Sequence, residues 1–415
     1  MSLHPTQILN RVVVLYPLIL SLLWCGLALV WSWRWEWPDR WRRVPPGEEN
    51  GPPVSVLIPC FNEGPRLADT LRAALQLRWP EWEVIAINDG STDDTARQLE
   101  AWAAAEPRLR VVHLASNQGK ALALRTGALL ARHEVLLCID ADALLDPRAV
   151  GWMVRHFSTD SRLGAVTGNP RIRNRSTLLG RLQVGEFSLV VGLIKRAQSM
   201  LGSLFCVSGV IGCFRREALH SVQYWDPHQL TEDIDITWRL QRAGWRVRYE
   251  PHALVWILMP ETLSGLWRQR RRWADGGLQV LRANLDLLWT PSQWRLLPLL
   301  LEPLASLLWV HLLALEGLLA LARPFQGLPP AETSVLPHGL GLALLLVCGL
   351  QLSISLLLDR PYDAELRRIG FWMIWYPTAY WLLTFAATLM ACWRQPLRSP
   401  AARARWISPD RGLSG

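Results

Sequence analysis

The fold is decided by residues 54–77, which read VSVLIPCFNEGPRLADTLRAALQL. The run Val54–Pro59 is short, apolar and rich in β-branched residues, which predicts a buried strand. From Arg66 to Leu77 the apolar residues recur at helical spacing, so we expect a helix to follow that strand. A β-α unit of this kind, when it repeats, builds a sheet that is covered by helices.

The β-α unit does repeat further along the chain. Glu83–Asn88 predicts a second strand, after which Ser91 or Thr92 should cap a helix that continues through Glu100. Two further strands and the helix between them are predicted at Arg110–Leu114, Lys120–Ala131 and Glu134–Ile139. We therefore expect an α/β domain with a Rossmann-like, mostly parallel sheet and helices on both faces.

Polar residues gather where the predicted strands end, and ligands of such sheets bind at the carboxyl ends of strands. Asn62 and Glu63 follow the first strand, Asp89 follows the second, and Asp140 and Asp142 follow the fourth. Two carboxylates separated by one residue can hold a divalent cation and leave room for phosphate oxygens. A solvated turn after a strand would use the same residues, so this pair alone does not decide between the two.

Three further features are rich in charge. Lys120 opens a predicted helix, where a phosphate would meet both an ammonium group and the helix dipole, unless this lysine is a solvated surface residue. Glu232, Asp233 and Asp235 place three carboxylates within four residues, as an acidic first helical turn also would. Residues 269–273 (QRRRW) lie in an amphipathic segment ahead of an apolar stretch, which indicates a membrane-interface helix that could also bind diphosphate and sugar.

Composition indicates a membrane protein with a cytosolic portion. Of 415 residues, 50% are apolar and 24 are tryptophan, which suits membrane-interface belts and sugar-stacking surfaces. The net charge of +9 comes almost wholly from arginine, since the only lysines are Lys120 and Lys195. Basic cytoplasmic loops explain this charge, whereas no nucleic-acid-binding motif is present. The seven cysteines show no zinc-ligand spacing and no even count, which favours a reducing compartment.

Four apolar stretches are candidates to span a bilayer, and they are Val12–Trp33, Leu296–Ala322, Gly339–Leu358 and Phe371–Trp393. The tryptophans and arginines between Arg34 and Arg43 place the N-terminus outside and the next domain in the cytoplasm. Three later spans would leave the C-terminus outside, yet its tail is rich in arginine. We therefore expect a cytoplasmic tail, with one stretch re-entrant or interfacial.

Four motifs occur in one order along the chain, and they are Asp89, the pair Asp140 and Asp142, Thr231–Asp233, and Gln269 with Arg272 and Trp273. Together they resemble the processive family 2 glycosyltransferases, which include cellulose, chitin and hyaluronan synthases. The chain is still more similar to the bacterial poly-β-1,6-N-acetylglucosamine synthases of biofilm matrix. That similarity covers nearly the whole chain and is carried by residues 59–63, 88–93, 166–173, 207–210, 256–263 and 404–406. The chain departs from it in showing a single span at the N-terminus, where such enzymes can carry an extra apolar segment.

The resemblance implies an inverting, processive transfer of N-acetylglucosamine from UDP-N-acetylglucosamine to a growing polysaccharide that is exported. It implies that Asp89 recognises the uridine, that Asp140 and Asp142 place Mg²⁺ or Mn²⁺ on the diphosphate, and that Asp233 is the catalytic base. It implies that Arg272 holds the diphosphate and that Trp273 lies beneath the acceptor sugar. Further candidates are Glu232 beside the base, Asn62, Glu63, Lys120 and Gln269 for the donor, and Ser208 and Gly209 for the acceptor.

The resemblance also implies a cytoplasmic domain of the GT-A type joined to a helical transmembrane domain in the bacterial inner membrane. Its implied partners are the lipid bilayer, a small membrane accessory subunit, and cyclic di-GMP at the subunit interface. The predicted parts are an N-terminal transmembrane helix and basic flank (1–50), the GT-A domain (51–255), amphipathic interface helices (256–294), transmembrane helices (295–395) and a basic tail (396–415).

Other interpretations stay open. A hyaluronan-, cellulose- or chitin-type synthase would use another UDP-sugar, and a non-enzymatic transport or scaffold protein would bind no UDP. A non-processive lipid-sugar transferase conflicts with residues 269–273 and the C-terminal spans. Glu302 and Glu316 share a helix face with Trp309 inside an apolar stretch. They could line an exit path for the polymer, or both could lie near the lipid headgroups.

Overall fold

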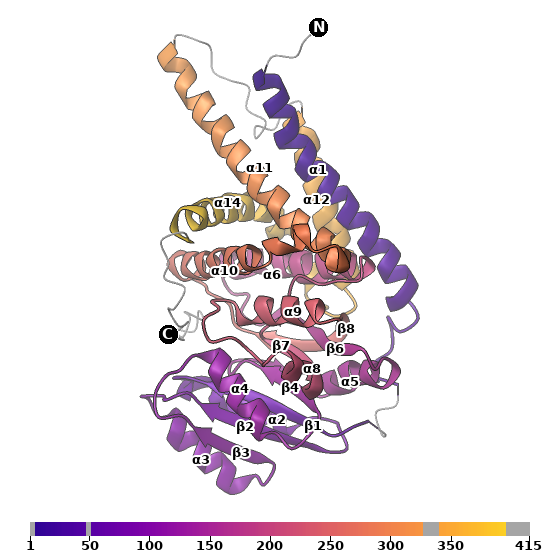
Figure 1. The fold of residues 1–415 in the computed structure, drawn as a ribbon, viewed down its shortest axis with the longest axis vertical. Coiled ribbons are helices and arrows are strands. Elements are labelled where there is room, and N and C mark those ends of the chain that lie inside the picture. The colour runs from indigo at the N-terminus through magenta and orange to yellow at the C-terminus, as the bar shows by residue number, and fades with distance from the viewer. Residues whose placement is uncertain (1–4, 47–50, 327–339, 396–415) are drawn as a thin grey trace.

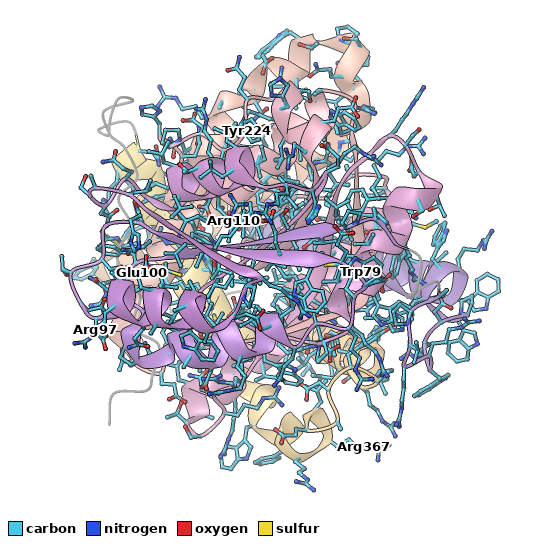
Figure 2. All side chains as sticks on the ribbon, turned by 90° about the horizontal axis from the view of Figure 1, so that it is seen from below. Trp79, Arg97, Glu100, Arg110, Tyr224 and Arg367 are labelled. Atoms are coloured by element: carbon cyan, nitrogen blue, oxygen red, sulfur yellow. The ribbon has the colours of Figure 1, made fainter. Side chains whose placement is uncertain are left out.

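The computed structural model describes residues 5–46, 51–326 and 340–395. Figure 1 shows a sheet domain at one end and three long helices, α1, α11 and α12, that project from the other end. Figure 2 looks from the sheet end, where Arg97 and Glu100 lie on α3 and Arg110 lies on β3. The predicted tail, residues 396–415, lies outside the described residues.

Eight strands form one sheet in the order β3-β2-β1-β4-β7-β6-β8-β5. Their bounds are β1 Val54–Cys60, β2 Trp82–Asn88, β3 Leu109–His113, β4 Val135–Ile139, β5 Leu144–Leu145, β6 Leu163–Ile172, β7 Ile211–Arg215 and β8 Arg246–Ile257. Strands β1 to β4 pair in parallel, as the β-α pattern predicts. Strand β7 runs antiparallel to both of its neighbours, so the whole sheet is mixed. Strand β8 continues past the predicted domain boundary at residue 255, because Trp256 still pairs with Arg171 of β6.

The helices of the sheet domain are α2 Gly64–Leu75, α3 Thr95–Ala105, α4 Lys120–Leu130, α5 Ala149–Thr159, α8 Arg216–Ser221 and α9 Glu232–Arg242. The prediction that Ser91 or Thr92 caps α3 is wrong, since that helix begins at Thr95. Both residues instead bind the turn after β1. The Asn62 N–H donates to Ser91 Oγ at 3.0 Å, and the Thr92 N–H donates to Asn62 Oδ1 at 2.8 Å.

Between the sheet and the long helices lie α6 Leu178–Phe187, the π-helical segment η2 Ser188–Ile194, α7 Lys195–Met200, α10 Leu263–Ala283 and α14 Tyr376–Arg394. Figure 1 shows α6, α10 and α14 lying across the long axis of the molecule. Helix α14 lies alongside α10, and at its end the Gln395 side-chain amide donates to the Asp275 carbonyl at 2.6 Å. This layer therefore lies between much of the sheet domain and the projecting helices.

Among the described residues, three helices are long and apolar enough to cross a membrane, at Gln7–Glu36, Pro291–Ala322 and Gly341–Asp359. They correspond to α1 (Pro5–Trp31), which continues as the π-helical turn η1 (Ser32–Glu36), and to α11 (Leu297–Ala322) and α12 (Leu340–Asp359). The fourth predicted stretch, Phe371–Trp393, contains α14 instead, which lies along α10.

The helix face that carries Glu302 and Trp309 packs against α1. The Tyr16 hydroxyl bonds Ser306 Oγ at 2.8 Å, and Ser306 in turn donates to Glu302 Oε1 at 3.1 Å. The Trp309 indole donates to the Val13 carbonyl at 2.7 Å. These contacts hold two candidate membrane helices together, and the hypothesis of an exit path lined by Glu302 and Glu316 stays a prediction.

A cluster of buried ions joins the projecting helices to the sheet domain. Arg196 of α7 contacts Glu36 of η1 at 2.6 Å and Asp359 of α12 at 2.8 Å. Arg171 of β6 contacts the other oxygen of Asp359 at 2.7 Å. We call these four residues the anchor cluster. All four are at most 2% exposed, so the cluster is closed to solvent.

Candidate active site

Predicted site residues from several elements meet at Lys120, the first residue of α4. Its ammonium lies 2.6 Å from Asp140 Oδ1, at the end of β4, and 3.2 Å from Glu232 Oε1, at the start of α9. It also donates to the Gly209 carbonyl at 3.0 Å. Burial lowers the pKa of Lys120, but Asp140 and Glu232 outweigh it and hold that pKa above its ordinary value. Lys120 therefore stays charged and draws the two acidic segments together.

Asp89 holds the loop that presents Lys120. Its carboxylate is fully buried and accepts the N–H groups of Gln118 and Gly119, each at 2.8 Å. Gly119 has a φ of 93°, a left-handed conformation that suits glycine. Burial raises the pKa of Asp89, and the two N–H groups oppose that rise. Because both oxygens face the loop, the predicted contact between Asp89 and uridine stays a prediction.

Asp233 and Glu232 are neighbours with different surroundings. Asp233 Oδ2 accepts the N–H of Gly209 at 3.1 Å, whereas Glu232 faces Lys120. Burial, and then the carboxylate of Glu232, raise the pKa of Asp233. Burial also acts to raise the pKa of Glu232, but Lys120 and Arg272 outweigh it and lower that pKa. A carboxylate with a raised pKa is better suited to accept a proton than its ion-paired neighbour.

Helix α10 places Arg272 beside these carboxylates. The Arg272 side chain is exposed and donates to the Leu230 carbonyl at 3.3 Å. Gly276, one turn further along, touches the side chain of Thr231, and any Cβ at this position would collide with it. Thus a glycine that sequence reasoning missed brings α10 against the acidic turn of α9.

Trp273 is half-buried and packs against the main hydrophobic core. The Arg270 guanidinium lies 4.2 Å from its ring centroid and contacts Glu186 at 2.5 Å. Arg270 therefore supports the indole, while Arg272 keeps its guanidinium at the carboxylates. Gln269 is half-buried, and its amide nitrogen lies 4.0 Å from the sulfur of Met259.

Asn62 and Glu63 form the turn between β1 and α2. Asn62 has a φ of 56° and binds the turn after β2, and the Glu63 N–H donates to Thr95 Oγ1 at 2.8 Å. The turns after β1 and β2 are therefore tied to each other, and the roles of Asn62 and Glu63 toward the donor stay predictions.

Asp140 and Asp142 fit a divalent cation that is completed by other ligands. The described residues contain no group of three or more His, Cys, Asp or Glu side chains that could hold a metal by themselves. Mg²⁺ is commonly held by one or two carboxylates together with phosphate oxygens and water. Asp142 is 7% exposed, and Asp140 binds Lys120 through Oδ1. This donor set therefore suits a cation that arrives with a diphosphate.

Sequence reasoning missed Lys195 and Thr167 as members of the site. The Lys195 ammonium donates to Thr167 Oγ1 at 3.0 Å, and the same oxygen accepts the N–H of Ser208 at 2.9 Å. The predicted residues Ser208 and Gly209 thus lie in a turn that both lysines contact, directly or through Thr167. The rarity of lysine in this chain was the available signal.

Comparisons with known proteins agree with this geometry. The profile described as "Glycosyltransferase like family 2" matches residues 52–276. A poly-β-1,6-N-acetyl-D-glucosamine synthase of Staphylococcus epidermidis is 36% identical over 96% of this chain and 97% of its own length. One of Staphylococcus aureus is 36% identical over 86% of this chain and 87% of its own length. A mannosyltransferase of Pyrobaculum calidifontis, solved with GDP-Man and Mn²⁺, has a similar fold, with a TM-score of 0.55 and 20% identity over 93% of this chain and 99% of that one.

Proposed function

Because this chain belongs to the family 2 glycosyltransferases, and the poly-β-1,6-N-acetyl-D-glucosamine synthases are among its relatives, we propose that it polymerises N-acetylglucosamine from UDP-N-acetylglucosamine. The observation that carries the proposal is the meeting of Lys120, Asp140, Glu232 and Asp233 around the Gly209 turn, with Arg272 beside them. This arrangement offers one carboxylate as a base and two cations for a departing diphosphate.

In the proposed reaction Asp233 takes the proton of an acceptor hydroxyl. The hydroxyl oxygen then bonds the anomeric carbon of the donor sugar, and UDP leaves with the electrons of the broken carbon–oxygen bond. A base of this kind typically contributes about 10²–10⁴-fold in rate. No second carboxylate is assigned as a nucleophile, so a single displacement converts an α-linked donor into a β-linked product.

Lys120 and Arg272 would stabilise the charge that develops on the diphosphate, since hydrogen bonds between ions are the stronger ones. Asp140 and Asp142 would hold Mg²⁺ or Mn²⁺, which supplies further charge stabilisation to the leaving group when bound. The Mn²⁺ and GDP-Man in the Pyrobaculum calidifontis enzyme are consistent with this assignment.

The remaining assignments divide between donor and acceptor. Trp273 would be the floor beneath the acceptor sugar, because its half-buried indole offers an apolar face. Ser208 and Gly209 would border the acceptor beside the base. The donor residues would be Asn62, Glu63, Asp89 and Gln269, of which Asp89 recognises uridine.

We place the protein in the bacterial inner membrane, with α1, α11 and α12 as spans. An outside N-terminus then leaves the catalytic domain in the cytoplasm, and the return through α12 leaves α14 and the C-terminus on the cytoplasmic side. Processive synthesis would be coupled to export, aided by a small accessory subunit and controlled by cyclic di-GMP at their interface. A reporter fused after Gly415 that is active only in the periplasm would contradict this topology.

The decisive experiment uses membranes that contain the full chain, incubated with Mg²⁺ and one UDP-sugar at a time. We expect UDP release and a high-molecular-weight β-1,6-linked product with UDP-N-acetylglucosamine alone, and loss of both after chelation of divalent cations. Polymer from UDP-glucose alone would support a cellulose-type synthase, and polymer that forms only when UDP-glucuronate is added beside UDP-N-acetylglucosamine would support a hyaluronan-type synthase. Absence of UDP binding and release with every sugar would favour a transport or scaffold protein.

A further inference from the structure

Lys195 is a charged residue in the interior that the proposed chemistry does not use. It lies at the start of α7 and is 7% exposed. Among the described residues no carboxylate forms an ion pair with it, whereas the next residue, Arg196, is paired with Glu36 and Asp359. An unpaired ammonium in such a place is costly, and an apolar side chain of similar length would avoid that cost.

The position of Lys195 connects it to the proposed base. Its ammonium donates to Thr167 Oγ1, which accepts the N–H of Ser208, and the next N–H in the chain, that of Gly209, donates to Asp233. The Lys120 ammonium donates to the carbonyl of the same Gly209, and Lys120 is one of the residues proposed to bind the sugar donor. The only two lysines of the chain therefore hold one turn from two sides.

We infer that Lys195 is a positioning residue for sugar transfer, which through Thr167 fixes the Ser208–Gly209 turn and so aims the Asp233 carboxylate at the acceptor hydroxyl. The inference rests on the proposed function and extends it. A point-like ammonium on a flexible stem can bind one hydroxyl in a narrow space where a guanidinium fork would not fit as well. This explains a lysine at position 195 in a chain whose only other lysine is Lys120 and whose remaining guanidinium or ammonium side chains are all arginine.

The charges around Lys195 add a pH signature. Burial lowers its pKa to about 8, and Asp233 and the Cys206 thiol partly oppose this shift. The other titratable groups at the site are Glu232, Lys120 and Arg272 around Asp233, with Glu36 and Asp359 around Arg196. The pKa of Lys120 and that of Cys206 are both raised, so neither group should titrate near pH 8. Turnover should therefore fall as pH rises through about 8, when Lys195 loses its charge.

The test compares Lys195→Met with Thr167→Val and with their double variant in membranes supplied with UDP-N-acetylglucosamine and Mg²⁺. We expect each single variant to lose roughly tenfold to a hundredfold in kcat, with KM for the donor within about threefold, since Lys120 is untouched. The double variant should lose little more than either single one, because both changes break the same connection. Thr167→Ser should recover most of the rate lost in Thr167→Val.

Two controls separate positioning from folding. Ser199→Ala, on the same helix, should leave kcat unchanged, and the thermal midpoint of Lys195→Met should equal that of the wild type or exceed it. The wild-type loss of rate above pH 8 should be absent in Lys195→Met. Unchanged kcat in Lys195→Met would overturn the inference, as would a parallel fall in thermal midpoint, kcat and donor affinity. An inactive wild type would remove the proposed function itself, which is a different failure.

Discussion

The cluster at Lys120 and the anchor cluster at Arg196 are both built from carboxylates and basic side chains, but they satisfy their charges differently. In the anchor cluster each carboxylate faces a guanidinium, and every member is closed to solvent. At Lys120, one ammonium serves two carboxylates, Asp233 accepts backbone N–H groups and the Cys206 thiol but forms no ion pair within the described residues, and Arg272 is exposed. A cluster of matched ion pairs can only hold elements together, whereas a cluster with a carboxylate outside the ion pairs and an exposed guanidinium can still take up a proton or an anion.

Asp233→Asn should produce the largest effect on activity and the smallest on folding. Asparagine keeps the size and the bond from Gly209 but cannot accept the proton, so turnover should fall about 10²–10⁴-fold. UDP release and UDP affinity would be measured in the same membranes, and affinity should survive. Asp235→Asn is the matched control and should keep its turnover, because Asp235 lies on the same helix but pairs with Arg239 at 2.7 Å. Near-normal turnover in Asp233→Asn would remove the base assignment.

Asp359→Leu should produce the opposite pattern. It leaves Arg171 and Arg196 without a shared carboxylate, and breaking a buried pair in this way typically costs about 3–5 kcal/mol. We expect a large drop in the thermal midpoint of the purified protein, while the folded fraction retains its turnover. Asp69→Ala, which removes an exposed pair with Arg72, should change the midpoint little. A stable but inactive Asp359→Leu would mean that the two clusters are not separate in function.

The pH dependence of turnover should follow Asp233. Its raised pKa means that the rate is lost as pH falls through a value above the ordinary range of aspartate. The same shift means that the contribution of Asp233 to stability is present below its unfolded pKa and is lost as pH rises through its folded pKa. Rates and thermal midpoints measured from pH 4 to 7 on wild type and Asp233→Asn would show both. An acid limb at the ordinary pKa of aspartate would contradict the shift.

Asp89→Asn should have a smaller effect than the changes above. It should mainly destabilise the loop at Gln118 and Gly119 and should affect the chemical step less. Removing a charged acceptor from two buried N–H groups typically costs about 1–3 kcal/mol. Because that loop presents Lys120, we expect a higher KM for the donor and a modest loss of kcat. If Asp89 instead acts only by binding uridine, the thermal midpoint of Asp89→Asn, measured without UDP-N-acetylglucosamine, would equal that of the wild type.

Local patterns in the sequence predicted β1 to β4 and the residues that meet at Lys120, because strand ends and short motifs depend on few neighbours. The same local patterns could not predict that β7 runs antiparallel between β4 and β6, since strand order is set by packing across the sheet. The cap of α3 was misplaced because Ser91 and Thr92 have partners at Asn62, thirty residues away in the chain. Arg196, Glu36 and Asp359 likewise carry no local signal, because their connection exists only after the long apolar helices have packed.

The contact of Gly276 with Thr231 fixes more than the position of Arg272. Helix α10 touches the acidic turn on one side and lies along α14 on the other, so the base has a set distance from that layer of helices. If the layer rests at the lipid headgroups, as the sequence predicts for residues 256–294, every sugar is added at one constant depth below the bilayer. Gly276 then sets the distance between the catalytic turn and the membrane. A larger residue at this position would push that turn away from the membrane and from the growing end of the product.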